Sequence, residues 1–219
     1  MGAWNVRTLI DSATSNRPDR RTALIAQQLL RFSVDIAALS ETRLAGEGSL
    51  REIGSQYTFF WKGKDQNERR IHGVGFAIKS SLVDKYNLSP TALNERLITI
   101  RIPMSRNQHM TIISAYAPTM NSADIVKEEF YSTLNNAIRA VPSSNKLFLL
   151  GDFNARVGCD SDLWHGVLGK HGVGNCNDNG RLLLGFCAEN ELTITNTCFR
   201  LATRKKTTWQ HPRSKQWHM

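Results

Sequence analysis

An acid and an amide two residues apart, Asp152 and Asn154, follow a short apolar run in this chain. The run, residues 146–150, shows no alternation of polar and apolar residues beyond its first lysine, which predicts a buried strand. Gly151 permits a sharp turn directly after it. Side chains two apart on an extended segment point the same way, so this carboxylate and this amide can hold one water molecule between them. The pair is suited to orienting a nucleophile, although Gly, Asp and Asn are also ordinary turn residues.

The same arrangement recurs at three other places along the chain. Short apolar runs end in Asn5, in Glu41 and in Tyr116, each of which can bind a metal ion or a phosphate group. Strand ends on one edge of a layered sheet converge, and a rigid edge is where site residues are positioned. Each residue alone has a plain alternative: a turn amide, a solvated loop acid and a half-buried aromatic. Repeated in order, they predict a single site at one sheet edge.

Five ordered motifs carry a resemblance that extends over essentially the whole chain. They are Trp-Asn-Val-Arg (4–7), Ser-Glu-Thr-Arg (40–43), Ser-Ala-Tyr-Ala-Pro (114–118), Gly-Asp-Phe-Asn-Ala (151–155) and Thr-Trp (208–209). They resemble the endonuclease/exonuclease/phosphatase superfamily, the group of exonuclease III, the apurinic endonucleases and DNase I. Residues 2–9 and 211–215 are most similar to the endonuclease domain of LINE-type (non-LTR) retrotransposons and to craniofacial development protein 2-like proteins.

The resemblance implies a fold and a set of roles. The fold is an α/β four-layered sandwich of the DNase I-like kind, with two packed mixed β-sheets flanked by helices, in one domain over residues 1–219. Phosphodiester cleavage calls for a divalent ion, and Mg²⁺ needs few protein ligands because it keeps several waters. Glu41 and Asn5 are the expected ligands, for Mg²⁺ or alternatively Mn²⁺. Asp152 would handle the attacking water, Asn154 would hold it in line, and Tyr116 would donate to the phosphate oxygens.

The sequence departs from the family at its C-terminal end. The family continues with a strand carrying an Asp-Tyr pair and then a Ser-Asp-His motif, whereas this sequence stops at Met219. None of its six histidines stands in such a motif. We therefore expect the last strands of the sandwich to be missing, with an unpaired edge, a marginal fold and poor nuclease activity in this chain alone.

The charge balance favours a polyanionic partner. The chain has 28 Lys and Arg against 19 Asp and Glu, for a net charge of +9 and a pI near 9.7. Residues 200–219 contain several basic residues and no acid, with two tryptophans between them that could stack on bases. A solvated basic face is the alternative. The predicted DNA contacts are Arg7, Arg156, Arg204, Lys205, Lys206, Thr208, Trp209 and Arg213; Thr208 matches the family position that lines the pocket for a base.

Composition limits the setting in which the protein works. No apolar run approaches the ~18 residues of a membrane span, and the first residues lack the profile of a signal peptide. The four cysteines form no Cys-x-x-Cys pair, which favours reduced thiols. These features predict an intracellular protein without a membrane or a small-molecule cofactor, and access to chromosomal DNA would place it in the nucleus.

Periodicity predicts alternating helices and strands. Helices are expected over residues 20–32, 124–140 and 181–189. Strands are expected over 34–40, 57–61, 73–78, 97–102 and 193–198. Glycine-rich loops are expected before residue 57, around Gly46, Gly48 and Gly54, and over 158–179.

Three functions compete at this point. The first is a Mg²⁺-dependent, apurinic-endonuclease-like DNA endonuclease of retrotransposon type, which leaves a 3′-hydroxyl and works beside a reverse transcriptase domain in the full-length element. The second is a catalytically impaired remnant that only binds DNA or a protein partner. The third is a phosphatase or phosphodiesterase for lipids or small molecules, which the net charge of +9 disfavours.

Overall fold

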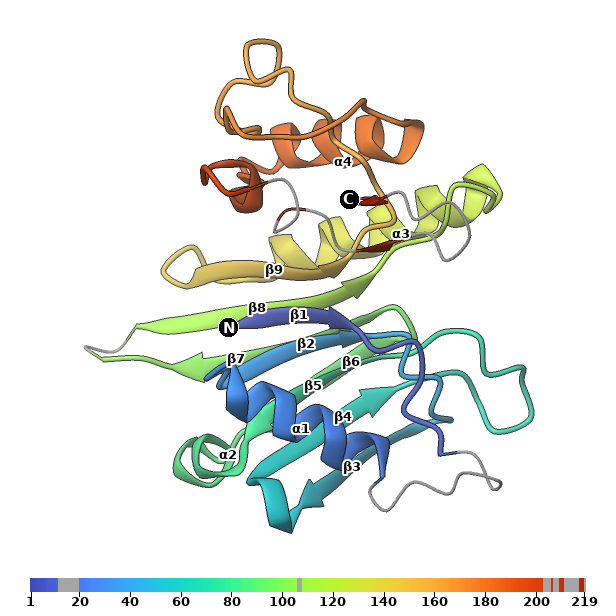
Figure 1. The fold of residues 1–219 in the computed structure, drawn as a ribbon, viewed down its shortest axis with the longest axis vertical. Coiled ribbons are helices and arrows are strands. Elements are labelled where there is room, and N and C mark those ends of the chain that lie inside the picture. The colour runs from blue at the N-terminus through green and yellow to red at the C-terminus, as the bar shows by residue number, and fades with distance from the viewer. Residues whose placement is uncertain (12–19, 106–107, 203–205, 207–208, 211–216, 219) are drawn as a thin grey trace. The chain divides into compact units, whose positions relative to one another are not determined.

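The chain forms two compact units in the computed structural model, which describes residues 1–11, 20–105, 108–202, 206, 209–210 and 217–218 (Figure 1). The first unit comprises residues 1–117 and 132–152, and the second comprises 118–131 and 153–219. A single domain over the whole chain stays a prediction.

A mixed five-stranded sheet forms one half of the first unit. Its order is β1-β2-β5-β4-β3, with β1 parallel to β2 and the other neighbours antiparallel. Strand β2 is buried along its whole length because it has a neighbour on each side and is covered on both faces. The strands are β1 (Gly2–Asn5), β2 (Ile36–Ser40), β3 (Glu47–Glu52), β4 (Tyr57–Lys62) and β5 (Val74–Lys79).

A mixed four-stranded sheet packs against the first. Its order is β6-β7-β8-β9, and β8 and β9 run parallel. Aliphatic and aromatic side chains of β2, β5, β7 and β8 fill the space between the sheets, among them Ile36, Phe76, Ile100 and Ile112. The strands are β6 (Thr91–Asn94), β7 (Leu97–Pro103), β8 (His109–Tyr116) and β9 (Lys146–Asp152).

Helices flank the sheets. Helix α1 (Arg21–Arg31) lies on the outer face of the five-stranded sheet, where Ile25, Ala26 and Leu29 contact a second apolar cluster that includes Leu39 of β2. This side-chain spacing puts one apolar stripe on the sheet. The short helices of the first unit are η1 (Ile53–Ser55) and α2 (Ser80–Tyr86). Two packed mixed sheets with flanking helices confirm the predicted α/β class.

The second unit is built around its own apolar cluster. Helix α4 (Asp178–Glu189) contributes Leu183, Leu184 and Cys187, which pack with Val157 and Leu168 from the long loop before it. The side chain of Asn177 caps this helix by accepting the N–H of Gly180. The unit also holds η2 (Thr195–Thr197) and the antiparallel pair β10 (Trp209–Gln210) and β11 (Trp217–His218), while α3 (Asp124–Arg139) runs through both units. In the described residues, no helix has the length and apolar character required to cross a bilayer.

Three predictions about elements are wrong. The glycine-rich loop before residue 57 contains strand β3, which pairs with β4, and its Gly48 is opposite Trp61, where a Cβ would overlap the indole ring. The expected strand over 193–198 is the 3₁₀ helix η2, joined to the rest of its unit by an isolated bridge between Leu168 and Ile194. The predicted strand at 146–150 is present as β9, but β9 is an edge strand of its sheet and Phe148 is 37% exposed. The prediction that this strand is buried is therefore wrong.

Candidate functional site

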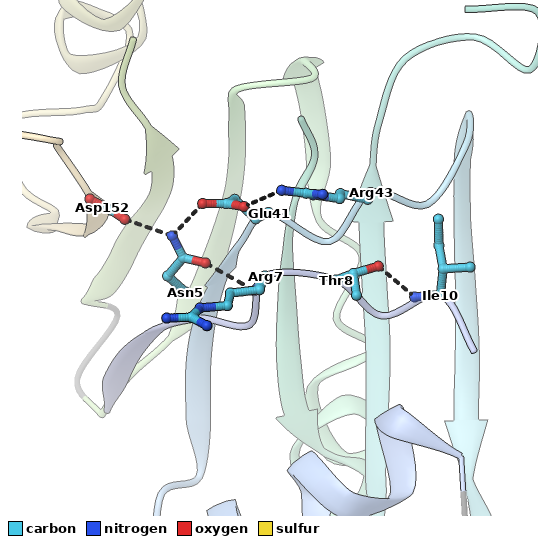
Figure 2. A network of polar contacts seen from close by, with 7 residues as sticks. All are labelled: Asn5, Arg7, Thr8, Ile10, Glu41, Arg43 and Asp152. Carbon is cyan, nitrogen blue, oxygen red and sulfur yellow. Dashed lines mark hydrogen bonds and ion pairs between the residues drawn. The ribbon is translucent and has the colours of Figure 1, made fainter. Parts of the chain in front are cut away.

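Four of the predicted residues meet in the first unit, where parallel strands end. Strand β1 of one sheet lies beside β9 of the other. Asn5 ends β1, Glu41 follows β2, and Tyr116 and Asp152 are register partners at the ends of β8 and β9. The Asn5 Nδ2 atom donates to Glu41 Oε1 and to Asp152 Oδ2, both at 2.8 Å (Figure 2). One amide thus joins two carboxylates that are 111 positions apart in the chain.

The orientation of the Asn5 amide is fixed from its other end. Its Oδ1 atom accepts the main-chain N–H of Arg7 at 2.9 Å, which turns the Nδ2 atom toward the carboxylates (Figure 2). The amide oxygen is therefore engaged by the backbone, and its nitrogen faces the acids. In this arrangement Asn5 holds the carboxylates in place, a different contact from the predicted direct role as a metal ligand.

Glu41 has a second partner that the motif alone does not reveal. Arg43 Nη2 donates to Glu41 Oε2 at 2.8 Å, and the Glu41 side chain is 18% exposed. Residues two apart meet here because both have left-handed backbone conformations, with φ of 56° at Glu41 and 55° at Arg43. The tight turn, rather than strand geometry, brings the guanidinium back onto the acid.

Unusual backbone conformations occur at this edge of the first unit. Arg7, Glu41 and Arg43 all have positive φ although none is glycine. A left-handed conformation costs a non-glycine residue roughly 1–2 kcal/mol, so it persists where the surroundings impose it. Such strain is frequent where side chains must be aimed for function, which supports this edge as the site.

Tyr116 is buried and remains a proton donor. Its pKa is raised to about 12, first by burial and then by the nearby carboxylates of Glu41 and Asp152, with a hydrogen bond to Glu41 adding to the effect. A neutral phenol at neutral pH can donate a hydrogen bond to an oxyanion, which is the role predicted for it.

Two further residues that the sequence reasoning did not single out for the site surround Tyr116. Arg96 Nη1 donates to the Tyr116 main-chain oxygen at 3.1 Å, and Arg96 Nη2 lies 2.9 Å from His72 Nε2. Burial, with a further contribution from Arg96, lowers the pKa of His72 to about 4, so the imidazole is neutral at pH 7. No local pattern connects residues 72, 96 and 116, because His72 comes from the loop before β5 of one sheet, whereas Arg96 from the β6–β7 turn and Tyr116 from β8 come from the other.

The remaining predicted residues fall outside this cluster or outside the described chain. Asn154 and Arg156 belong to the second unit, where the Asn154 main-chain oxygen accepts from Asn179 and Arg156 is exposed. Lys206, also in that unit, donates from Nζ to the His171 main-chain oxygen at 2.7 Å. Trp209 lies in β10. Residues that the structure does not describe are Arg204, Lys205, Thr208 and Arg213.

The donor set of the cluster fits a hard divalent cation. Two carboxylates lie 2.8 Å from one nitrogen, and Mg²⁺ is bound in proteins by one or two carboxylates together with water and substrate phosphate. Among the described residues, no group of three or more Asp, Glu, His or Cys side chains forms a metal cage. An all-protein Zn²⁺ or Ca²⁺ cage therefore does not fit the part of the chain that is described, whereas a sparsely ligated Mg²⁺ does.

Comparison with known protein families gives the same grouping as the motifs. A family model described as "Endonuclease/Exonuclease/phosphatase family" matches residues 2–217. The chain belongs to this family. The matched range covers all four residues of the cluster.

Curated relatives and solved structures add context. Craniofacial development protein 2 from Bos taurus and from Tragulus javanicus are each 30% identical over 212 residues, 97% of this chain, and the chain spans about a third of their length (33% and 34%). Danio rerio TDP2 complexed with a single-strand DNA product aligns with a TM-score of 0.46 at 17% identity, over 74% of this chain and 61% of its own. An AP endonuclease from Archaeoglobus fulgidus aligns with the same score at 16% identity, over 77% and 65%.

Proposed function

We propose that the chain is a Mg²⁺-dependent phosphodiesterase that nicks DNA in the manner of the apurinic endonucleases. In this proposal it derives from a non-LTR retrotransposon. The nick leaves a 3′-hydroxyl, from which a reverse transcriptase domain of the full-length element could start. We further propose that it acts in the nucleus. The observation that carries the proposal is the Asn5 amide, which holds the Glu41 and Asp152 carboxylates together at the joined edges of two sheets.

The two carboxylates have different tasks in this proposal. Glu41 holds the divalent ion, which when bound would offset charge on the phosphoryl oxygen and on the leaving oxygen. Asp152 orients the attacking water and takes its proton, so that the water oxygen forms the new bond to phosphorus while the bond between phosphorus and the 3′-oxygen breaks. The 3′-oxygen takes up a proton from solvent and leaves as a 3′-hydroxyl, and the phosphate stays on the 5′-oxygen of the other fragment. Asn5 keeps Asp152 in place.

Tyr116 supplies a neutral donor to the phosphate. As charge accumulates on the non-bridging oxygens in the transition state, a phenol hydroxyl directed at them stabilises that state more than the ground state. The raised pKa of Tyr116, about 12, keeps its proton in place at neutral pH. The Glu41 carboxylate lies close enough to raise the pKa of this hydroxyl, so the phenol is at the site where the ion and the phosphate would bind.

DNA as the substrate class rests on charge. The net charge of +9 favours a polyanionic partner. Arg7, two residues after Asn5, is exposed and available to a phosphate. Neutralising Arg204, Lys205 and Lys206 together should weaken binding to duplexes of different sequence by the same factor and flatten its salt dependence, because phosphate contacts carry no sequence information. Neutralising exposed Arg101 on β7 is the control. An unchanged salt slope would identify the basic cluster as a solvated face.

The activity is tested by nicking of supercoiled plasmid, in which a single break per molecule is detected as a relaxed circle. The 219-residue chain should relax plasmid slowly with Mg²⁺ and not with a chelator. A polymerase should extend the nicks directly, because their 3′-hydroxyls are free. Nicks that become extendable only after phosphatase treatment would contradict the proposed cleavage side.

A second function is favoured by the state of Glu41. Its two carboxylate oxygens accept from Asn5 and from Arg43, so a cation must compete with both donors. A remnant that only binds DNA or a protein partner would keep this closed network. Duplex binding without relaxation at any Mg²⁺ or Mn²⁺ concentration, by a folded chain, would favour that function over the nuclease.

A further inference from the structure

Arg96 contacts Tyr116 through both its main chain and its side chain. The main-chain oxygen of Arg96 accepts the Tyr116 N–H at 2.9 Å, and Arg96 Nη1 donates to the main-chain oxygen of Tyr116 at 3.1 Å. The guanidinium carbon also lies 5.5 Å from the centre of the Tyr116 ring, within the range of a cation–π contact. Arg96 is itself fixed in the turn between β6 and β7, where its N–H donates to Asn94 Oδ1 at 2.9 Å.

His72 holds the other side of the Arg96 guanidinium. An arginine stays protonated and has no acceptor, so the contact of 2.9 Å requires His72 Nε2 to accept and places the proton of the neutral imidazole on Nδ1. The His72 and Tyr116 rings are 5.9 Å apart and tilted by 55°. The His72 main-chain oxygen accepts the N–H of Arg43 at 3.0 Å, which ties this imidazole to the turn that carries Glu41.

These contacts leave the Tyr116 phenol little freedom. Its main chain is held at both N–H and C=O, and a guanidinium lies near its ring. The Glu41 carboxylate lies close enough to raise the pKa of its hydroxyl. The Arg96 side chain is half-buried and directed at protein groups, so it acts on the site through the tyrosine.

We infer that Arg96 is a positioning residue that holds the Tyr116 hydroxyl at the carboxylate site, with His72 as the brace that fixes the guanidinium. The inference rests on the proposed function, in which Tyr116 donates to the phosphate. A DNA-binding arginine would contact the substrate, whereas Arg96 acts through Tyr116. A purely structural arginine would be needed in any background, whereas the loss of Arg96 should lower the nicking rate only while the Tyr116 hydroxyl is present.

A double-mutant cycle on plasmid nicking tests this distinction. Arg96→Lys keeps the positive charge but loses the planar guanidinium that contacts Tyr116 and His72 at the same time. It should lower kcat about tenfold while KM changes less than about twofold, because coupling free energies between residues in contact correspond to rate changes of this size. In a Tyr116→Phe background the same change should cost less than about twofold. Arg101→Lys, on the exposed face of β7, is the matched control. Equal losses in the two backgrounds, or a rise in KM instead, would overturn the inference.

A second measurement needs no nicking activity. With ¹³C at Cζ of the four tyrosines, assigned by Tyr116→Phe, Arg96→Lys should shift the Tyr116 signal and leave Tyr57 unchanged. Long-range ¹H–¹⁵N spectra should show His72 protonated on Nδ1 in the wild type and as a mixture of tautomers in Arg96→Met. A wild-type His72 protonated on Nε2 would overturn the inference. Failure of the proposed function alone would show as no nicking by any variant, with these signals still changing as stated.

Discussion

Strand β2 lies between β1 and β5, and all five of its residues are buried. Strand β9 is an edge strand whose first four residues alternate between exposed and half-buried and whose last three are half-buried. Both are short apolar runs with an acid at or directly after the end, and each runs parallel to one neighbouring strand. Each supplies one carboxylate to the Asn5 amide. The difference shows that a site at a sheet edge can join a rigid central strand to a peripheral one, provided that one side chain holds both ends together.

The largest expected difference between the two strands is in their contribution to stability. Leu39→Ala in β2 removes a fully buried side chain and should lower the free energy of unfolding by about 3 kcal/mol. Phe148→Ala in β9 removes a larger side chain that is 37% exposed, and it should cost less than about 1 kcal/mol. Urea unfolding of the two variants measures both values. Similar losses would mean that β9 is covered in solution.

The contrast between these strands also shows what sequence can predict. Apolar content located both strands within a residue or two, but it did not distinguish them, because burial depends on whether a second strand and a covering helix are present. The residues at the strand ends were predicted because Asn5, Glu41, Tyr116 and Asp152 each follow an apolar run in a recurring pattern. Arg43, His72 and Arg96 have no such signal, since their contacts arise from a left-handed turn and from loops of different sheets.

The next comparison is between Gly151, which precedes Asp152, and Gly73, which pairs with the turn after Glu41. Gly151, before Asp152, has φ of +148°, and a Cβ there would overlap the main-chain oxygen of Ala115. Gly73, paired with the turn after Glu41, has φ of +123°, and its Cβ would overlap the Thr42 hydroxyl. A side chain can rotate away and a carbonyl in a sheet cannot, so Gly151→Ala should destabilise the chain more, by about 1 kcal/mol or more beyond Gly73→Ala. Thermal unfolding of the two variants tests the order, and the reverse order would contradict it.

The smallest expected effect concerns His72, whose main-chain oxygen accepts from Arg43 in the turn after β2. The pKa of His72 is lowered to about 4 in the folded chain, from an ordinary value near 6.5. Between these values the unfolded chain binds the extra proton and the folded chain does not, so this contribution to stability is complete above pH 6.5 and is lost as pH falls toward 4. His72→Gln, which keeps an acceptor for Arg96, should flatten the fall in unfolding free energy over that window. Exposed His165→Gln should not, and identical slopes in all three proteins would contradict the buried, neutral imidazole.

The Mg²⁺ dependence of plasmid nicking tests most directly whether the two strand ends share one site with separate tasks. Glu41→Gln should need more Mg²⁺ and recover part of its rate as the ion is added, because one ligand is weakened. Asp152→Asn should lose ~10²–10⁴ in rate at every Mg²⁺ concentration, because the group that handles the water is gone. Asp35→Asn, which changes an exposed acid at the opposite end of β2, should behave as the wild type does. Near-normal nicking by Asp152→Asn would contradict the account.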